Sequence, residues 1–247
     1  MGDFNSPMYK MTIAYDGTAY AGFQSQPNSP SIQTTIEKAL SILLREKISI
    51  IGASRTDAGV HALGQVAHFT APHLPLLYSL NALLPPDIRI LTIEEVPPTF
   101  HARYSALRKT YYYHLALHPD PFRRNISLNL KMKLDLNRLK TGAAYFLGTH
   151  DFTSFSNKAG RGCAKNKPIK TLYRLDLIEE GDRIRLEFEA DGFLYKMVRN
   201  IVGTLLEVAR GALSPHTIPK ILQEKSRRLA GPTAPPHPLF LIKVDYE

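Results

Sequence analysis

Two hydrophobic periodicities alternate along the chain, and this alternation constrains the fold more than any other sequence feature. From Met8 to Tyr15 apolar and polar residues alternate and β-forming residues dominate, which predicts a strand that runs into a turn at Asp16-Gly17. Ser29-Pro30 then provides a helix start, and apolar residues follow at helical spacing from Ile32 to Leu44. A chain that changes from a period of two to a period of 3.6 builds strands and helices into one mixed fold.

Later segments repeat this change of period. The further strands are predicted over 48–51, 65–69, 88–96, 110–117, 171–180 and 183–190, and the further helices over 76–84, 136–147 and 197–210. The turn sequences 14–20 and 190–195 resemble each other, and each follows a strand, which hints at two related halves. We therefore expect an α+β fold with two lobes, in which helices cover mixed sheets.

Charge and cysteine content limit the classes of protein to consider. The 247 residues contain 31 Lys and Arg against 22 Asp and Glu, a formal net charge of +9. Such a charge fits binding to nucleic acid, and it equally fits a surface adjusted for solubility. The single cysteine, Cys163, excludes an internal disulfide and a multi-cysteine zinc site. No apolar run approaches the roughly 18 residues of a membrane span and no signal-peptide core is present, so a cytoplasmic location is expected.

The most unusual segment is the polar, glycine-punctuated stretch 52–62 between two predicted strands. Within it Arg55 stands two residues from Asp57, and a neighbouring positive charge keeps a carboxylate ionised. Asp57 is therefore a candidate nucleophile. The alternative is a structural Arg-Asp contact in a turn, which the local sequence by itself favours.

A metal site is not expected. His61, His68 and His73 do not share a helix at ligand spacing and have no acidic partner nearby in the sequence. Neither a phosphate-binding loop nor a dinucleotide fingerprint occurs, and Cys163 lacks the setting of a catalytic thiol.

Seven collinear motifs resemble one known family. The stretch GASRTDAGVHALGQVAHF resembles the signature of the TruA family of tRNA pseudouridine synthases, in which the RTDAGVHA loop presents a catalytic aspartate. In the same order as in that family stand YDGTAYAGFQSQ, NALLPPDI, FHARYSALRKTYYYHL, GTHDFTSF, DGFLYKMVRNIVGTLLEV and LFLIKVDY. The resemblance extends over nearly the whole chain.

The resemblance implies a role for individual residues. Asp57 matches the essential aspartate, Arg55 the arginine associated with base displacement, and Tyr111 the active-site tyrosine, while Arg199 matches the arginine that pairs with the aspartate. Phe193, Leu194 and Met197 would line the pocket. The other expected substrate contacts are Gln24, His61, Arg108, Lys109, Lys165, Lys167 and Lys170.

The family also implies a fold, partners and a reaction. It implies an N-terminal lobe over 1–105 and a C-terminal lobe over 106–247 around a basic central cleft, a homodimer, and uridines of the tRNA anticodon stem-loop as substrates, with neither cofactor nor metal. Isomerisation would proceed through attack of Asp57 on C1′ or C6, or through stabilisation of an oxocarbenium ion. The rival hypothesis is a catalytically silent RNA-binding protein that uses the same cleft.

The chain departs from the family pattern at a few positions. Phe23 and Ser25 stand where the family commonly has tryptophan and arginine, Lys170 where it often has arginine, and Asp191-Gly192 and Pro238 also differ. We expect these departures to affect RNA affinity and the range of targets rather than the reaction.

Overall fold

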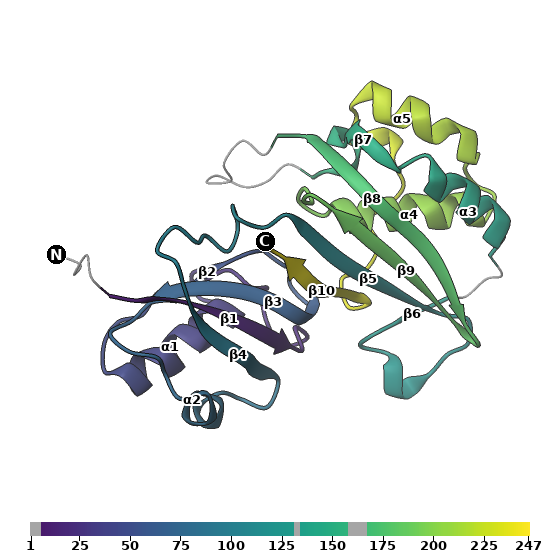
Figure 1. The fold of residues 1–247 in the computed structure, drawn as a ribbon. Coiled ribbons are helices and arrows are strands. Elements are labelled where there is room, and N and C mark those ends of the chain that lie inside the picture. The colour runs from purple at the N-terminus through teal and green to yellow at the C-terminus, as the bar shows by residue number, and fades with distance from the viewer. Residues whose placement is uncertain (1–5, 131–133, 158–166) are drawn as a thin grey trace. The chain divides into compact units, whose positions relative to one another are not determined.

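The computed structural model describes residues 6–130, 134–157 and 167–247, and the chain divides into two compact units (Figure 1). The first unit comprises Met1–Leu107 together with Phe240–Glu247, and the second comprises Arg108–Leu239. The expected division at 105/106 lies close to this one. Residues 240–247, however, belong to the first unit, because the last strand pairs with a strand of that unit and such pairing does not depend on distance along the chain.

The first unit is a sheet with two helices. Its strands are β1 (Met8–Tyr15), β2 (Ile51–Gly52), β3 (His61–Thr70), β4 (Ile88–Val96) and β10 (Leu239–Asp245), and its helices are α1 (Ile32–Leu44) and α2 (Leu77–Leu83). The strand order is β4-β1-β3-β10, with β2 paired to β3. β1 is antiparallel to both of its neighbours, whereas β10 runs parallel to β3.

The predicted strand and helix at the start of the chain are confirmed, with one correction. β1 has the predicted bounds, and every second residue of it is buried. α1 buries the predicted apolar stripe, but its N-cap is Ser31 rather than Ser29-Pro30, because the Ser31 hydroxyl accepts a hydrogen bond from the Thr34 amide at 3.2 Å.

The strands beside the unusual loop differ from their predicted bounds. The strand predicted over 48–51 is reduced to β2, although Ile48 and Ile50 are buried. The strand predicted over 65–69 is longer, since β3 begins at His61. The loop that carries Asp57 is therefore shorter than expected and is held at both ends by a strand.

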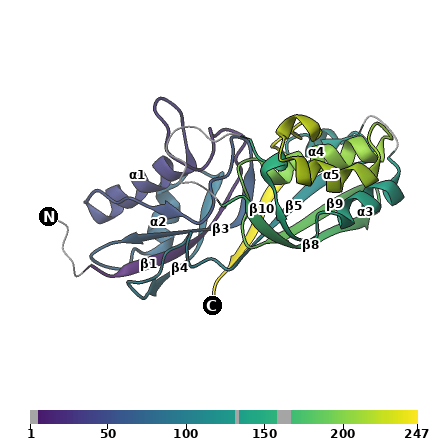
Figure 2. The same cartoon turned by 90° about the horizontal axis from the view of Figure 1, so that it is seen from above.

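The second unit contains five paired strands and three α-helices. Its strands are β5 (Arg108–Ala116), β6 (Leu128–Asn129), β7 (Gly148–Asp151), β8 (Ile169–Glu180) and β9 (Arg183–Ala190), and its helices are α3 (Leu136–Ala144), α4 (Met197–Ala209) and α5 (Ile218–Glu224). The order β5-β9-β8-β7 is antiparallel throughout, and β6 pairs with β5. The three helices gather on one side of this sheet (Figure 2).

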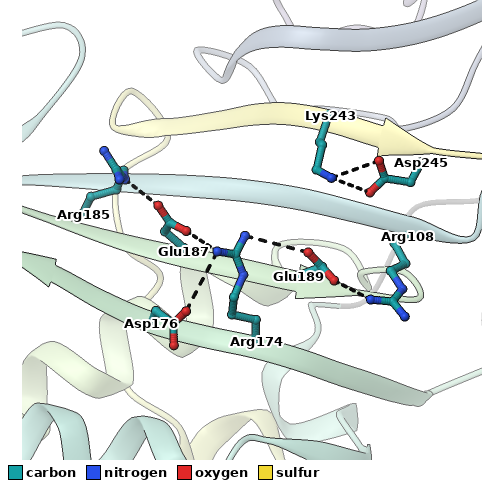
Figure 3. A network of polar contacts seen from close by, with 8 residues as sticks. All are labelled: Arg108, Arg174, Asp176, Arg185, Glu187, Glu189, Lys243 and Asp245. Atoms are coloured by element: carbon teal, nitrogen blue, oxygen red, sulfur yellow. Dashed lines mark hydrogen bonds and ion pairs between the residues drawn. The ribbon is translucent and has the colours of Figure 1, made fainter.

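The alternation along β9 explains why helices cover only one face of the sheet. Its even-numbered residues, Ile184, Leu186, Phe188 and Ala190, are buried, whereas the odd-numbered ones are charged. Figure 3 shows three of these charged residues, Arg185, Glu187 and Glu189. Glu187 and Glu189 pair with Arg174 of β8, and Glu189 also pairs with Arg108 of β5, while Arg185–Glu187 and Arg174–Asp176 are pairs within one strand. The Lys243–Asp245 pair in the same view lies within β10.

α4 is the central helix of the second unit. Ten of its thirteen residues are buried, in agreement with the strongly apolar helix predicted over 197–210. Gly211 follows it with a positive φ of 84°, the left-handed conformation that ends many helices. Within the part of the chain that the structure describes, no helix combines the length and apolarity that a bilayer crossing requires.

Candidate active site

The Asp57 loop connects β2 to β3 in the first unit. Asp57 is half-buried and Arg55 is exposed. The Val60 amide donates to the Asp57 carbonyl at 3.1 Å, and Gly59 takes a positive φ of 75° that few other residues adopt. This turn directs the chain into β3 immediately after the aspartate.

Buried polar side chains from β1 and β3 hold this loop. The Tyr15 hydroxyl and the Thr56 hydroxyl lie 2.7 Å apart. The Gln65 amide brackets Ser54, because it donates to the Ser54 carbonyl at 2.8 Å and accepts from the Ser54 amide at 3.2 Å. Burial raises the pKa of Tyr15 to about 12 against the opposing effect of its hydrogen bonds to Thr56 and Gln65, so the phenol stays neutral. Residues adjacent to Asp57 are thus anchored on two strands.

The sequence analysis missed Tyr15 and Gln65 as contributors to the site. Both are polar or partly polar residues at buried strand positions, with 4% and 0% of their surface exposed. A buried polar group requires a partner, so their place in apolar strands is the signal that points to them. The partner itself is not readable from the sequence, because Gln65 and Tyr15 are 50 residues apart.

The segment after the first turn also packs against the loop. The Phe23 amide donates to the Thr56 carbonyl at 3.1 Å. A Cβ atom on Gly22 would lie 2.7 Å from that same carbonyl oxygen and 3.2 Å from the Ala58 nitrogen. Phe23 is 2% exposed, and its ring lies against Gly52. Phe23 therefore supports the loop from within the unit, whereas Gln24 next to it is exposed.

His61 has contacts inside the first unit. It is 1% exposed, and its ring stacks on Phe240 with centroids 4.6 Å apart. Its Nδ1 atom lies 3.2 Å from the Gly17 amide and 3.1 Å from an Asp16 carboxylate oxygen. These contacts stabilise the turn beside the loop, and a contact of His61 with RNA stays a prediction.

Tyr111 and the predicted pocket residues belong to the second unit. Tyr111 lies on β5, is 6% exposed, and meets Phe193 edge to face with ring centroids 5.1 Å apart. Leu194 and Met197 are 7% and 1% exposed, and the Met197 amide donates to the Leu194 carbonyl at 3.0 Å. The structure thus brings Tyr111 and Phe193 together, while Met197 is a core residue at the start of α4.

Arg199 lies in the first turn of α4 and is half-buried. Its Nε donates to the Ala234 carbonyl at 2.8 Å, and the Ala234 amide donates back to the Arg199 carbonyl at 3.0 Å. These two bonds fix one edge of the guanidinium group relative to the helix.

The predicted basic contacts differ in their surroundings. Arg108 pairs with Glu189 at 2.8 Å and lies over the Tyr173 ring, 4.5 Å from its centroid. Lys109 is 9% exposed, and its contact with RNA stays a prediction. Lys167 is exposed and Lys170 is half-buried beside Gly192, while Lys165 lies outside the described residues.

The candidate residues are thus divided between the units. Arg55, Asp57, His61 and Gln24 lie in the first, and Tyr111, Phe193, Leu194, Met197, Arg199, Arg108, Lys109, Lys167 and Lys170 lie in the second. Among the residues that the structure describes, no group of three or more His, Cys, Asp or Glu side chains could hold a metal ion.

Comparisons with known proteins identify the family. The family model for tRNA pseudouridine synthase matches residues 11–105 and 143–247. The chain is 55% identical to tRNA pseudouridine synthase A 1 of Protochlamydia amoebophila, over 97% of this chain and 96% of that protein. It is 46% identical to tRNA pseudouridine synthase A of an Exiguobacterium species, over 96% of this chain and 97% of that protein.

Solved structures give only a distant likeness. The crystal structure of a Cbf5-Nop10-Gar1 complex is similar with a TM-score of 0.34 and 10% identity, over 84% of this chain and 55% of that one. The family model and the curated relatives carry the assignment. The match to the family model and the identity to these relatives show that the chain, with its α+β pseudouridine synthase fold, belongs to the tRNA pseudouridine synthase family.

Proposed function

We propose that the chain converts uridine to pseudouridine in the anticodon stem-loop of tRNA, with Asp57 as nucleophile or charge stabiliser. The observation that carries this proposal is the loop itself, because Asp57 is half-buried at the first position of the turn 57–60, and Thr56 and Ser54 before it are hydrogen-bonded to two strands. Such preorganisation costs no rearrangement at the moment of reaction. As a tRNA pseudouridine synthase the enzyme is an isomerase acting on tRNA.

The reaction suits a carboxylate. The bond between N1 of uracil and C1′ of ribose breaks, the base turns, and C5 bonds to C1′ while the C5 proton is released and N1 gains a proton. The atoms balance without an oxidant, reductant or energy source. An ionised Asp57 can attack C1′ or C6, or can stabilise a cationic sugar.

The other residues are proposed to serve the displaced base. A paired base cannot be reached inside its helix, so it must be flipped out, and exposed Arg55 is suited to replace it in the stack. Tyr111, held by Phe193, offers a ring face or a phenol proton to the base. Arg199 is proposed to pair with Asp57, and Arg108, Lys167 and Lys170 are proposed to bind phosphates.

Two further proposals rest on the resemblance to the family. The enzyme is proposed to act as a homodimer, which light scattering of the purified protein tests directly. It is also proposed to act in the cytoplasm, where its tRNA substrate is made. The rival function, a silent RNA-binding protein, is not favoured, because binding of phosphates has no use for a carboxylate at the tip of the loop.

Release of tritium from tRNA labelled at uridine C5 tests the function. We expect release by the unaltered protein and none by Asp57→Asn. Asp120→Asn is the matched control, because Asp120 is also half-buried but caps a short helical turn of the second unit. An isolated anticodon stem-loop should support release, and one from another tRNA arm should not. Binding of tRNA without release by the unaltered protein would refute the proposal.

A further inference from the structure

The segment 230–235, which we call the clamp segment, packs against the N-terminal half of α4 through main-chain contacts. A Cβ atom on Gly203 would lie 1.7 Å from the Pro232 carbonyl oxygen. A Cβ atom on Gly231 would lie 2.7 Å from the Thr204 Cα. The Thr204 hydroxyl also accepts a hydrogen bond from the Gly231 amide at 2.9 Å. Glycine on both sides thus permits a close approach that no larger residue allows.

Arg227 joins the clamp segment to α4. Its Nη1 donates to the carbonyls of Ala230 and Gly231 at 3.2 and 2.8 Å. Its Nη2 donates to Asn200 Oδ1 and Thr233 Oγ1, both at 3.0 Å. The Thr233 hydroxyl donates in turn to Asn200 Oδ1 at 2.7 Å. Arg227 therefore binds both the main chain of the clamp segment and a side chain of the helix.

The same cluster reaches a second loop. Asn200 is fully buried, and its Nδ2 donates to the Phe155 carbonyl at 2.8 Å and to Asn157 Oδ1 at 2.9 Å. Arg227 Nε also lies 3.5 Å from Asn157 Oδ1. All five N–H groups of the Arg227 guanidinium thus have an acceptor, a pattern that the three donors of a lysine cannot reproduce.

The clamp segment ends at Arg199 of the candidate site and at Tyr113, a neighbour of the candidate residue Tyr111. Ala234 exchanges hydrogen bonds with Arg199, which directly precedes Asn200 in α4. The Pro235 carbonyl accepts from the Tyr113 hydroxyl at 3.0 Å. Tyr113 is two residues from Tyr111 on β5, and side chains two residues apart lie on the same face of a strand. The clamp segment therefore links the helix that carries Arg199 to the strand that carries Tyr111.

We propose that Arg227 is a positioning residue for catalysis, which aligns the Arg199 guanidinium through the clamp segment. Arg227 and Arg199 act on the same segment at its two ends, residues 230–231 and residue 234. A shift of the segment on α4 moves the Ala234 carbonyl, and the Arg199 edge bonded to it moves as well. The inference rests on the proposed function, because it assumes that Arg199 acts in the isomerisation.

The test is Arg227→Lys, which keeps the charge but loses the planar fork of donors. We expect kcat for tritium release from tRNA to fall by about 10- to 100-fold with KM within about twofold, because a displacement of about 1 Å in a catalytic group costs that much. Thr233→Val should lower kcat in the same direction, and Thr233→Ser should restore it because serine keeps the hydroxyl.

Arg138→Lys is the matched control. Arg138 also donates to main-chain carbonyls of the second unit, Val208 at 3.1 Å and Leu213 at 3.1 Å, but at the other end of α4. The variant Arg138→Lys should lower the melting temperature about as much as Arg227→Lys does, and it should leave kcat within about twofold of the unaltered value. In the Arg199→Lys background, Arg227→Lys should lower kcat by less than about twofold more, because the two residues act on one group.

Several outcomes would overturn the inference. These are an unchanged kcat in Arg227→Lys, a loss expressed only in KM, an equal loss of kcat in Arg138→Lys, full activity of Arg199→Lys, and full additivity in the double variant. If Arg227→Lys fails to fold by circular dichroism, the Thr233 pair decides in the same way. Failure of the proposed function gives a different result, the absence of tritium release from the unaltered protein.

Discussion

Gly22 controls the position of the Asp57 loop, and Gly22→Ala tests this directly. Its φ of 106° is strained for any residue with a side chain, and a Cβ atom there would lie 2.7 Å from the Thr56 carbonyl oxygen. Ordinary contact begins at 3.4 Å, so the main chain of Thr56 and Asp57 must retreat by about 0.7 Å. The three atoms nearest to the new methyl group, Thr56 O, Ala58 N and Asp57 C, belong to the main chain and cannot turn aside by a change of rotamer.

Two effects of Gly22→Ala are expected. The backbone conformation itself costs roughly 1–2 kcal/mol, which lowers the melting temperature of a chain of this length by about 2–8 °C. The retreat of the loop should lower kcat by about 10- to 100-fold, because a misplacement of about 1 Å in a reacting group has an effect of that size.

Gly211→Ala separates the two effects. Gly211 has a φ of 84°, and among the described residues no atom lies within 4 Å of the position that its Cβ would take. Tritium release from C5-labelled tRNA and thermal unfolding should be measured on both variants. We expect similar losses of melting temperature and a loss of kcat in Gly22→Ala alone. Full kcat in Gly22→Ala, or an equal loss in Gly211→Ala, would refute the reasoning.

Three further predictions follow from buried polar groups. Tyr15→Phe removes the hydroxyl that bonds Thr56, so unfolding in urea should show a loss of about 1–3 kcal/mol together with a lower kcat, and unchanged kcat would contradict the anchoring role. Burial, reinforced by the charges of Arg185, Arg183 and Arg123 against the opposing Glu180, lowers the pKa of His114 to about 4. This histidine therefore contributes stability that is present above about pH 6.5 and lost as the pH falls toward 4. In His114→Gln, the free energy of unfolding should fall by about 2 kcal/mol less between pH 6.5 and pH 4 than in the unaltered protein. Glu187 is 5% exposed and lies between Arg174 and Arg185, so Glu187→Gln should lower the free energy of unfolding by about 2 kcal/mol. Glu179 is exposed and pairs with Lys140, so Glu179→Gln should lower it by less than about 1 kcal/mol. Equal losses in urea unfolding would argue against the effect of burial.

The sequence predicts the elements of this fold well where periodicity is strong. β1, β4 and β9 have the predicted bounds, and α4 differs from its prediction by one residue. The errors occur at the two-residue strand β2 and at the Ser31 cap, and the sequence analysis did not predict α5, β6, β7 or β10. A strand of two residues has no periodicity to detect, and a cap depends on which of several neighbouring hydroxyls meets the amide.

The site was predictable in part. The RTDAGVHA motif identified the Asp57 loop and the family, and both rest on residues adjacent in the sequence. Arg227 escaped the sequence analysis, because its partners Asn200 and Asn157 are 27 and 70 residues away. The burial of His61 and Lys109 was likewise not readable from the sequence, because it depends on residues that pack around them in the fold.

The sequence by itself therefore determined the α+β class, the strongly periodic helices and strands, and the family, because periodicity and motifs are properties of neighbouring residues. Only the tertiary structure decided that β10 joins the first unit, that Tyr15 and Gln65 anchor the loop, and that Arg227 links the clamp segment to α4. The physical reason is that a buried donor or acceptor must find a partner, and packing brings that partner from anywhere along the chain.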